Sequence, residues 1–315
     1  MRSEYDSVPL DELGVLRVRG ADVVPFLQGQ VSNDVALLGP ARSLLAGYHN
    51  PQGRVIALVR LVQAAADEVL AILPRELAAS TASRLAKFIL RAKVQLADES
   101  ASWQITGVVA ADSPAPRAPP FAGALPQALN ATARVGDSIA LRIGAQPARW
   151  LLLAGAGAAP SAPVALAGCA PMELERWRAL AVAAGEPQVG AATSGEFVAQ
   201  MLNLDLLGAI AFDKGCYTGQ EVIARAHYRG RVKRRLQRFV SNAPLRLQPG
   251  DAGALSDGRA LKVVNAVALA DGRSEFLAVA PFAAEDCAAG GPQPPAEGAR
   301  VIDAQQLALP YCLPP

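Results

Sequence analysis

The sequence predicts an α+β fold with antiparallel sheets and a small β-barrel at the C-terminal end. Two observations lead to this prediction. Over roughly the first hundred residues, strand-like and helix-like patterns alternate, and neighbouring strands are joined by tight turns. From residue 236 onward, short β-like runs alternate with turns rich in Gly, Asp and Pro, which is typical of a small barrel or sandwich.

The N-terminal elements follow from the periodicity of apolar residues. Strands are predicted at 13–18, 44–49, 54–62 and 69–73, and an Asn-Pro-Gln-Gly turn at 50–53 predicts a hairpin. A helix is predicted at 21–28. A second helix is predicted from Pro74 to about Arg91, with five residues on one face: Leu77, Thr81, Leu85, Phe88 and Ile89.

The remaining elements complete the division of the chain. Loops are predicted at 111–128, which holds five prolines, and at 155–171; a helix is predicted at 172–184 and another from about Thr218. The C-terminal strands are predicted at 236–240, 261–269 and 276–279. We therefore expect one region at 1–238, built from two interleaved subdomains, and a barrel domain at 239–315.

Composition excludes several classes of protein. Prolines interrupt the uncharged stretch between Arg149 and Glu173, so we expect no membrane span, and no apolar segment follows the N-terminus, so we expect a cytoplasmic protein. The four cysteines are far apart and the chain has only two histidines, so no metal site is expected. The net charge of +2 is too small to imply a nucleic-acid partner by itself.

The segment Lys-Gly-Cys-Tyr-Thr-Gly-Gln-Glu at 214–221 carries the chemistry that we expect. Thr218 and Glu221 form a capping box, so Cys216 should lie just before a helix N-terminus. The helix dipole, together with Lys214 and Arg225, would favour a thiolate. The alternative from the residues alone is a buried structural cysteine in a tight loop.

Seven cations and no acidic residue occupy positions 225–238. If the segment is extended, residues 229, 231, 233 and 235 share one face, which could hold a polyglutamate tail or an RNA backbone. A solvated strand that faces carboxylates elsewhere in the fold is an equal alternative.

The 214–221 segment, followed by Arg225 and the basic run, resembles the signature of the YgfZ proteins, a folate-binding family related to the T-protein of the glycine cleavage system. Four further segments resemble the family's pattern, so that most of residues 10–240 is covered: 20–22 with 26–35, 50–54, 185–187 and 197–204. The resemblance implies an aminomethyltransferase-like, folate-binding fold.

The resemblance also implies functional residues. The expected cofactor is tetrahydrofolate, with or without a polyglutamate tail, and Cys216 is the expected reactive group. The residues expected beside it are Lys214, Tyr217, Gln220, Glu221 and Arg225. The resemblance implies that Trp177 contacts folate. Four more residues are expected to bind folate because their polar side chains could hydrogen-bond the donor-rich edge of a pterin: Asn33, Asp34, Gln200 and Asn203. From the residues alone, Trp177 is a core residue of its helix, Asn33 and Asp34 fit a turn or cap equally well, and Gln200 and Asn203 fit the solvent face of a helix.

The resemblance implies a factor that supports the assembly or repair of iron–sulfur clusters in client enzymes, including tRNA-modifying ones. One alternative is a folate-dependent aminomethyltransferase of the glycine cleavage type, which would be a one-carbon transferase. Against it, T-proteins carry a Phe-Ile-Gly type sequence where this chain has Cys216 to Gly219. Another alternative is an RNA-binding module that uses the basic segment 225–238, with nucleic acid as the less favoured partner.

Overall fold

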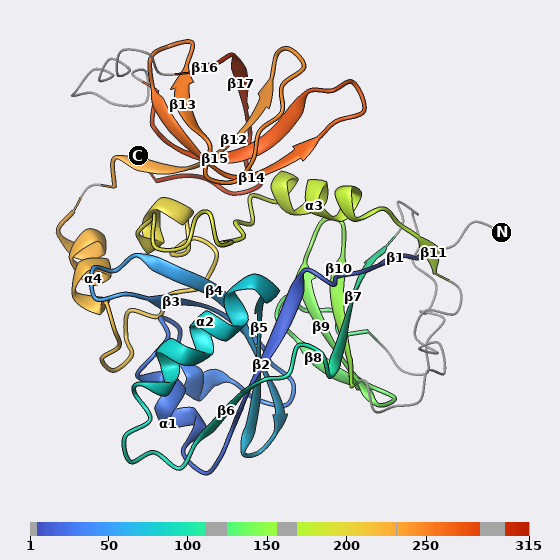
Figure 1. Ribbon diagram of the computed structural model, residues 1–315, viewed down its shortest axis with the longest axis vertical. Coiled ribbons are helices and arrows are strands. Elements are labelled where there is room, and N and C mark those ends of the chain that lie inside the picture. Colours follow the sequence, from blue (N-terminus) through green and yellow to red (C-terminus); the bar gives the residue numbers. More distant parts are fainter. Residues whose placement is uncertain (1–4, 111–124, 156–168, 231, 284–299, 315) are drawn as a thin grey trace. The chain divides into compact units, whose positions relative to one another are not determined.

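The computed structural model describes residues 5–110, 125–155, 169–230, 232–283 and 300–314 (Figure 1). The chain forms two compact units, each assembled from separate segments. The first unit consists of residues 1–48, 57–177 and 213–217. The second unit consists of residues 49–56, 178–212 and 218–315. Most of the loops predicted at 111–128 and 155–171 lies outside the described residues.

The first unit contains a five-stranded sheet that confirms the predicted N-terminal strands. The strand order is β3-β4-β5-β2-β6, and β2 pairs antiparallel with both β5 and β6. The strands are β2 (Leu13–Arg19), β3 (Leu44–His49), β4 (Val55–Ala65), β5 (Glu68–Pro74) and β6 (Gln95–Asp98). Strand β5 is buried over most of its length, which explains its nearly continuous apolar sequence.

A second, six-stranded sheet of the same unit was not predicted from the sequence. Its order is β11-β1-β7-β10-β9-β8, antiparallel except for the β1–β11 pair. Trp150 and Leu152 alternate into a core with Tyr5 and Val108. The strands are β1 (Tyr5–Pro9), β7 (Trp103–Ala110), β8 (Thr132–Val135), β9 (Ser138–Gly144), β10 (Arg149–Gly155) and β11 (Ala170–Pro171).

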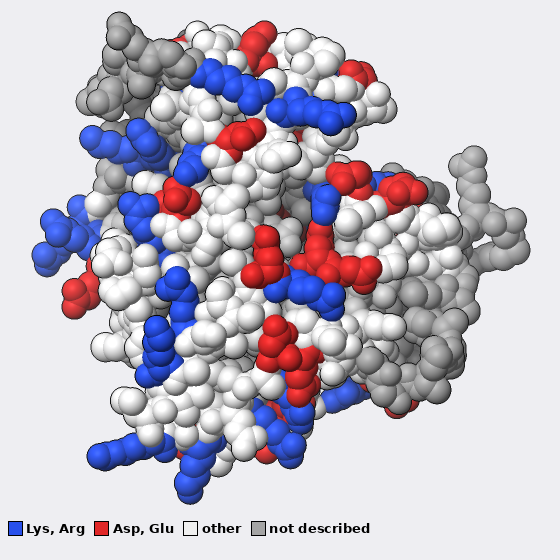
Figure 2. All heavy atoms as spheres, in the orientation of Figure 1, with Lys and Arg blue, Asp and Glu red and all other residues white. Residues whose placement is uncertain are grey.

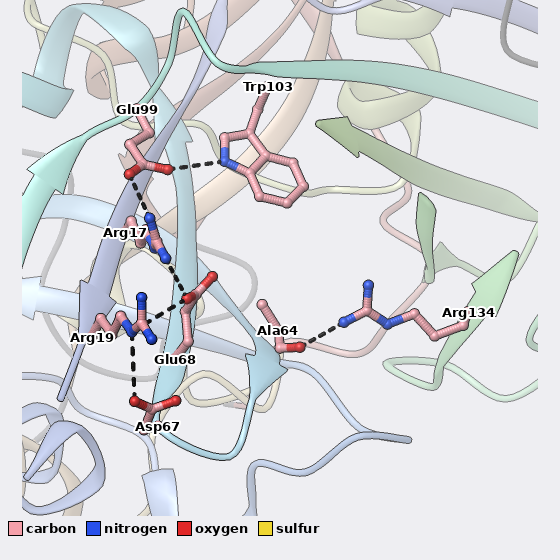
Figure 3. Close-up of polar contacts among 8 residues, drawn as sticks. All are labelled: Arg17, Arg19, Ala64, Asp67, Glu68, Glu99, Trp103 and Arg134. Carbon is pink, nitrogen blue, oxygen red and sulfur yellow. Dashed lines mark hydrogen bonds and ion pairs between the residues drawn. The ribbon is translucent and has the colours of Figure 1, made fainter. Parts of the chain in front are cut away.

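Polar contacts join the two sheets of the first unit (Figure 3). Arg17 on β2 donates to Glu68 at 2.7 Å and to Glu99 at 3.0 Å, and the indole of Trp103 on β7 donates to Glu99 at 3.4 Å. The hydrogen bond with Glu68, followed by that with Glu99, raises the pKa of Arg17, so this guanidinium stays charged. One carboxylate therefore accepts hydrogen bonds from both sheets.

Helix α2 (Arg75–Ala86) ends earlier than the sequence predicts. Its inward residues are buried as predicted: Leu77, Thr81 and Leu85. Past Ala86 the backbone tightens, because Phe88 donates to the carbonyl of Leu85 and Ile89 to that of Ala86, three residues back. Phe88 is 46% exposed, so the predicted extension of the helix to Arg91 with Phe88 on the buried face is wrong.

Three other helices are α1 (Val23–Gln28), α3 (Leu174–Ala183) and α4 (Gln220–Tyr228), and short 3-10 turns cover Val35–Leu37 and Ala199–Leu202. The helices predicted at 21–28 and 172–184 are confirmed, with ends shifted by one or two residues. In the part of the chain that is described, no helix has both the length and the apolar character that crossing a membrane requires.

The C-terminal sheet of the second unit is a nearly closed barrel, as predicted. Its order is β16-β13-β14-β15-β12-β17. The two edge strands are separated in sequence by Asp303 alone, so the sheet curls until its edges meet. Phe276, Ala278 and Ala280 alternate into its core. The strands are β12 (Arg234–Ser241), β13 (Ala252–Leu255), β14 (Ala260–Ala268), β15 (Ser274–Pro281), β16 (Val301–Ile302) and β17 (Ala304–Leu307).

Trp177 packs on a glycine of strand β7. A Cβ atom added at Gly107 would lie 2.7 to 2.9 Å from three atoms of the Trp177 ring, and the ring is 7% exposed. The guanidinium carbon of Arg149 lies 5.8 Å from its centroid. The ring therefore belongs to the core of the first unit, as the residues alone suggested.

We expect Gly107→Ala to lower the free energy of unfolding by about 1–3 kcal/mol, because the added methyl group overlaps the Trp177 ring. Gly155→Ala at the end of β10 is the control, because its Cβ would meet nothing within 4 Å, and it should change stability by less than about 0.5 kcal/mol. Urea unfolding of both variants checks this, and equal stabilities would contradict the packing described.

Candidate functional site

Residues 213–217 belong to the first unit, where Lys214 fixes their position. Its Nζ donates to the backbone carbonyls of Gln28 and Val31 at 2.7 Å each and to that of Asn33 at 2.8 Å. An ammonium group has three protons, so all of its donors are used. Burial lowers the pKa of Lys214 to about 8, against the opposing attraction of Asp34.

The end of helix α1 explains why these carbonyls are available. Residues 29, 30 and 31 fold back to donate to Phe26 and Leu27, which leaves the carbonyl of Gln28 without an intrahelical donor. Lys214 supplies that donor from a distant part of the sequence. A cation at the carboxyl end of a helix is also favoured by the local dipole.

Asn33 and Asp34 shape the turn that follows α1. The Asn33 amide donates to the carbonyl of Leu45 at 2.7 Å, and its oxygen accepts from the N–H of Asp34 at 2.9 Å. Asp34 Oδ1 accepts from the Gln28 side chain at 2.8 Å and from the N–H of Ala36 at 3.1 Å, so it caps the 3-10 turn. The turn and cap role is thus present, and folate contact at these residues stays a prediction.

Cys216 is an exposed, free thiol. Tyr217 next to it is buried, and the Nζ of Lys214 lies 5.0 Å from the centroid of its ring. Burial raises the pKa of Tyr217 to about 12, so its hydroxyl keeps its proton near neutral pH. Cys169 differs, because burial raises the pKa of its thiol to about 11. The segment therefore presents one accessible sulfur between two anchored side chains.

In the second unit, α4 begins differently from the prediction. The residue before its first turn is Gly219, with φ +84°, and no side chain caps the helix, so the predicted capping box of Thr218 and Glu221 is wrong. A Cβ at Gly219 would lie 2.6 Å from the carbonyl oxygen of Asn50 and 2.9 Å from the Cα of Gly53. Close packing of two backbone segments, rather than a side-chain cap, sets the start of the helix.

The 50–53 turn is the tight hairpin turn that the sequence predicts. The N–H of Arg54 donates to the side chain of Asn50 at 2.9 Å, and Gly53 has φ +70°. A Cβ at Gly53 would lie 2.9 Å from the Cβ of Val222 on α4. Two segments that the sequence singled out separately, 50–54 and 219–222, thus pack together within the second unit.

Gln220, Glu221 and Arg225 lie on α4. Gln220 is half-buried, whereas Glu221 and Arg225 are exposed, with Glu221 in the first turn and Arg225 in the last. That these three residues act together with the thiol of Cys216 stays a prediction.

Gln200 and Asn203 are buried, so the alternative that placed them on the solvent face of a helix is wrong. Gln200 Nε2 donates to the carbonyl of Ile223 at 2.7 Å. Asn203 has φ +57° at the end of its 3-10 turn and donates to the carbonyl of Leu236 at 2.9 Å. Both side chains hold backbone segments of the second unit together.

The basic segment does not place residues 229, 231, 233 and 235 on one exposed face. Arg235 is buried and makes a two-pronged contact with Asp205, 2.9 Å at each oxygen, and Arg238 contacts Glu275 at 2.7 Å. A shared exposed face that includes Arg235 is therefore wrong, because β12 turns this side chain inward; Arg231 lies outside the described residues. Arg235 and Arg238 instead follow the alternative that was considered from the sequence, in which the cations face carboxylates elsewhere in the fold.

Two side-chain acceptors are buried without a partner among the described residues. Gln30 was not singled out from the sequence, and Gln200 was singled out but not predicted to be buried. Gln30 Oε1 in the first unit and Gln200 Oε1 in the second are shielded from solvent and have no hydrogen-bond partner in the described part of the chain. Their residue types gave no signal that they would be buried. Among the residues with described positions, no three His, Cys, Asp or Glu side chains lie together in a way that could hold a metal ion.

Comparisons with known proteins agree with the fold. No family model matches the chain. Two curated relatives are both named tRNA-modifying protein YgfZ. The one from Yersinia pseudotuberculosis serotype O:1b (strain IP 31758) is 34% identical over 238 residues, which cover 75% of this chain and 71% of the relative. The one from Enterobacter sp. (strain 638) is 33% identical over 271 residues, which cover 84% and 82%.

Among solved structures, the glycine cleavage system aminomethyltransferase T from Bartonella henselae is similar with a TM-score of 0.70, covering 89% of this chain and 79% of that protein. The sequence identity is 14%, so the likeness concerns the fold. It confirms the predicted aminomethyltransferase-like fold.

We expect the stability of the wild type relative to Lys214→Met to rise between pH 8 and pH 10.5. The native state releases the Lys214 proton near pH 8, whereas the unfolded chain keeps it to about the ordinary pKa of 10.5, so the native state gains free energy across this window. Denaturant unfolding of both proteins through the window measures the difference. A relative stability that stays level up to about pH 10.5 and falls above it would mean that the three carbonyls raise this pKa instead.

We expect Gly219→Ala to destabilise the protein by about 1–3 kcal/mol, because alanine meets both a strained positive φ and the carbonyl of Asn50. Gly215→Ala in the same motif is the matched control, since its Cβ would meet nothing within 4 Å. The control should change stability by less than about 0.5 kcal/mol. If thermal unfolding gives the two variants the same loss, backbone packing does not set the start of α4.

Proposed function

Since the chain belongs to the YgfZ family of tRNA-modifying proteins, we propose that it is a tetrahydrofolate-binding factor of the cytoplasm that supports the assembly or repair of iron–sulfur clusters in client enzymes, including tRNA-modifying ones. The observation that carries the proposal is the exposed thiol of Cys216 on a segment that Lys214 anchors. A client protein can reach such a sulfur, and the anchored backbone limits the entropy that ordering it would cost.

Two features of the thiol suit contact with a cluster or a one-carbon unit. It is exposed, unlike Cys169, whose thiol is half-buried and has a pKa of about 11. Cys216 is also two residues from Lys214, a cation that three backbone carbonyls hold in place. Residue types and positions therefore favour Cys216 over Cys169 as the reactive group.

The buried acceptors support a folate ligand. A pterin ring carries N–H donors along one edge, and each unit holds a buried acceptor that no described donor satisfies: Gln30 Oε1 in the first unit, and separately Gln200 Oε1 in the second. Asp34 Oδ2 is a further acceptor, because the hydrogen bonds of this carboxylate use Oδ1. When bound, tetrahydrofolate would supply a carrier of one-carbon units. In the first unit, the residues that would hold it are Gln30 and Asp34, with Trp177 as the further residue implied by the family. In the second unit, Gln200 and Asn203 stay candidates by themselves.

The first test is complementation of cells that lack the native protein. We expect Cys216→Ser to leave cluster-dependent tRNA-modifying enzymes at their uncomplemented activity, because serine cannot replace a thiolate as a nucleophile or metal ligand. Cys312→Ser is the matched control, since Cys312 is also exposed and free, and it should restore activity fully. Full restoration by Cys216→Ser would remove the thiol from the mechanism.

The second test separates folate binding from stability. Gln30→Leu removes a buried acceptor without a partner, so the variant should be as stable as the wild type or more stable, yet bind tetrahydrofolate about tenfold more weakly by calorimetry. Thr81→Val is the control, because Thr81 Oγ1 is equally buried without a partner and lies on α2. It should leave binding unchanged. Wild-type affinity in Gln30→Leu would show that this acceptor does not meet the ligand.

A further inference from the structure

Helix α4 ends in a cluster of aromatic rings that is open to solvent. The rings of Phe212 and His227 stack with centroids 3.7 Å apart, and Tyr228 meets them edge-on at 6.1 and 4.7 Å. Tyr228 is 65% exposed and His227 is exposed as well. Large apolar rings are normally covered, so this cluster offers a face on which another planar group can stack.

Exposed cations without carboxylate partners lie beside these rings in the sequence. Four residues are exposed and form no ion pair with any described residue: Arg225, Arg229, Lys233 and Arg234. Arg235 and Arg238, in contrast, are held by Asp205 and Glu275. The basic segment thus divides into two arginines that stabilise the fold and four cations that are free to meet an anion.

Gln200 ties both ends of this segment to one buried turn. Its side-chain Nε2 donates to the carbonyl of Ile223 on α4 at 2.7 Å, and its backbone carbonyl accepts from Arg235 on β12 at 3.1 Å. Arg225 follows Ile223 by two residues. Arg234 precedes Arg235, and because side chains alternate along a strand it points outward where Arg235 points inward. Figure 2 shows Lys and Arg side chains projecting around the place where Figure 1 draws α4.

We propose that the three rings and the four exposed cations, here called the α4 surface, bind a single-stranded segment of RNA. The cations would contact phosphates, and a base would stack on the exposed ring of Tyr228. A single strand fits better than a duplex, because the faces of bases within a duplex are already covered by stacking on the neighbouring base pairs. A polyglutamate tail would match the cations but has no ring for the aromatic cluster to stack on.

The charge component is tested by the salt dependence of binding. Fluorescence anisotropy with a labelled single-stranded RNA oligonucleotide compares the wild type with the combined variant Arg225→Gln, Arg229→Gln, Lys233→Gln and Arg234→Gln. The slope of log affinity against log salt should become shallower by about 0.7 for each cation that contacts a phosphate. Arg246→Gln combined with Arg300→Gln, two exposed cations of the barrel, should leave the slope unchanged. An unchanged slope in the combined variant would overturn the proposal.

The stacking component is tested separately. Tyr228→Ala should weaken binding of the single strand about tenfold without changing the salt slope, and Tyr228→Phe should retain binding, because stacking needs the ring and not the hydroxyl group. Duplex RNA that binds as tightly as the single strand would contradict the proposal. The proposal would also be contradicted if the variant with all four cations replaced lost its binding of pteroylpentaglutamate but still bound the RNA. All RNA measurements are made without folate, so they are independent of the folate proposal.

Discussion

The ammonium group of Lys214 is the constraint on which the candidate site depends. It is partly removed from water, which lowers its pKa to about 8, and three backbone carbonyls accept hydrogen bonds from its three N–H groups. A charged group in such surroundings has few alternative positions, because leaving any one carbonyl would strand a donor and an acceptor in a poorly solvated place. Cys216, two residues further on, is exposed on a backbone that has little freedom to move. Exposure and restraint together distinguish this thiol from Cys169.

The second unit has a comparable division between structure and function. Buried polar groups at Gln200, Asn203 and Arg235 connect a 3-10 turn, α4 and the first barrel strand. Their hydrogen bonds are directed to backbone atoms, to the Asp205 carboxylate, to the Tyr311 hydroxyl and to one another. These bonds fix the elements without using the exposed face of α4. The rings and cations on that face are consequently available for a partner. A fold can hold a binding surface steady only if different residues perform the two tasks.

Much of the fold and part of the site could be predicted from the sequence. The segment around Cys216 indicated both the family and a thiol before a helix, and the N-terminal strands followed from periodicity. The partners of Lys214 could not be predicted, because backbone carbonyls carry no sequence signature. The capping box at Thr218 failed because a tertiary contact at Gly219 outweighs local capping preference. The sheet that contains β1 and β7 was missed because it pairs β1 with two strands that are far from it in sequence, β7 and β11.

Native-state hydrogen exchange tests most directly whether Lys214 holds this region together. The amides of residues 30–36 are the relevant probes, since this turn carries two of the three carbonyls that the ammonium contacts and closely follows the third, that of Gln28. Lys214→Met should exchange them at least tenfold faster than the wild type, while protection in the C-terminal barrel stays the same. Equal protection of this turn in both proteins would contradict the account, because the turn would then be ordered without the lysine.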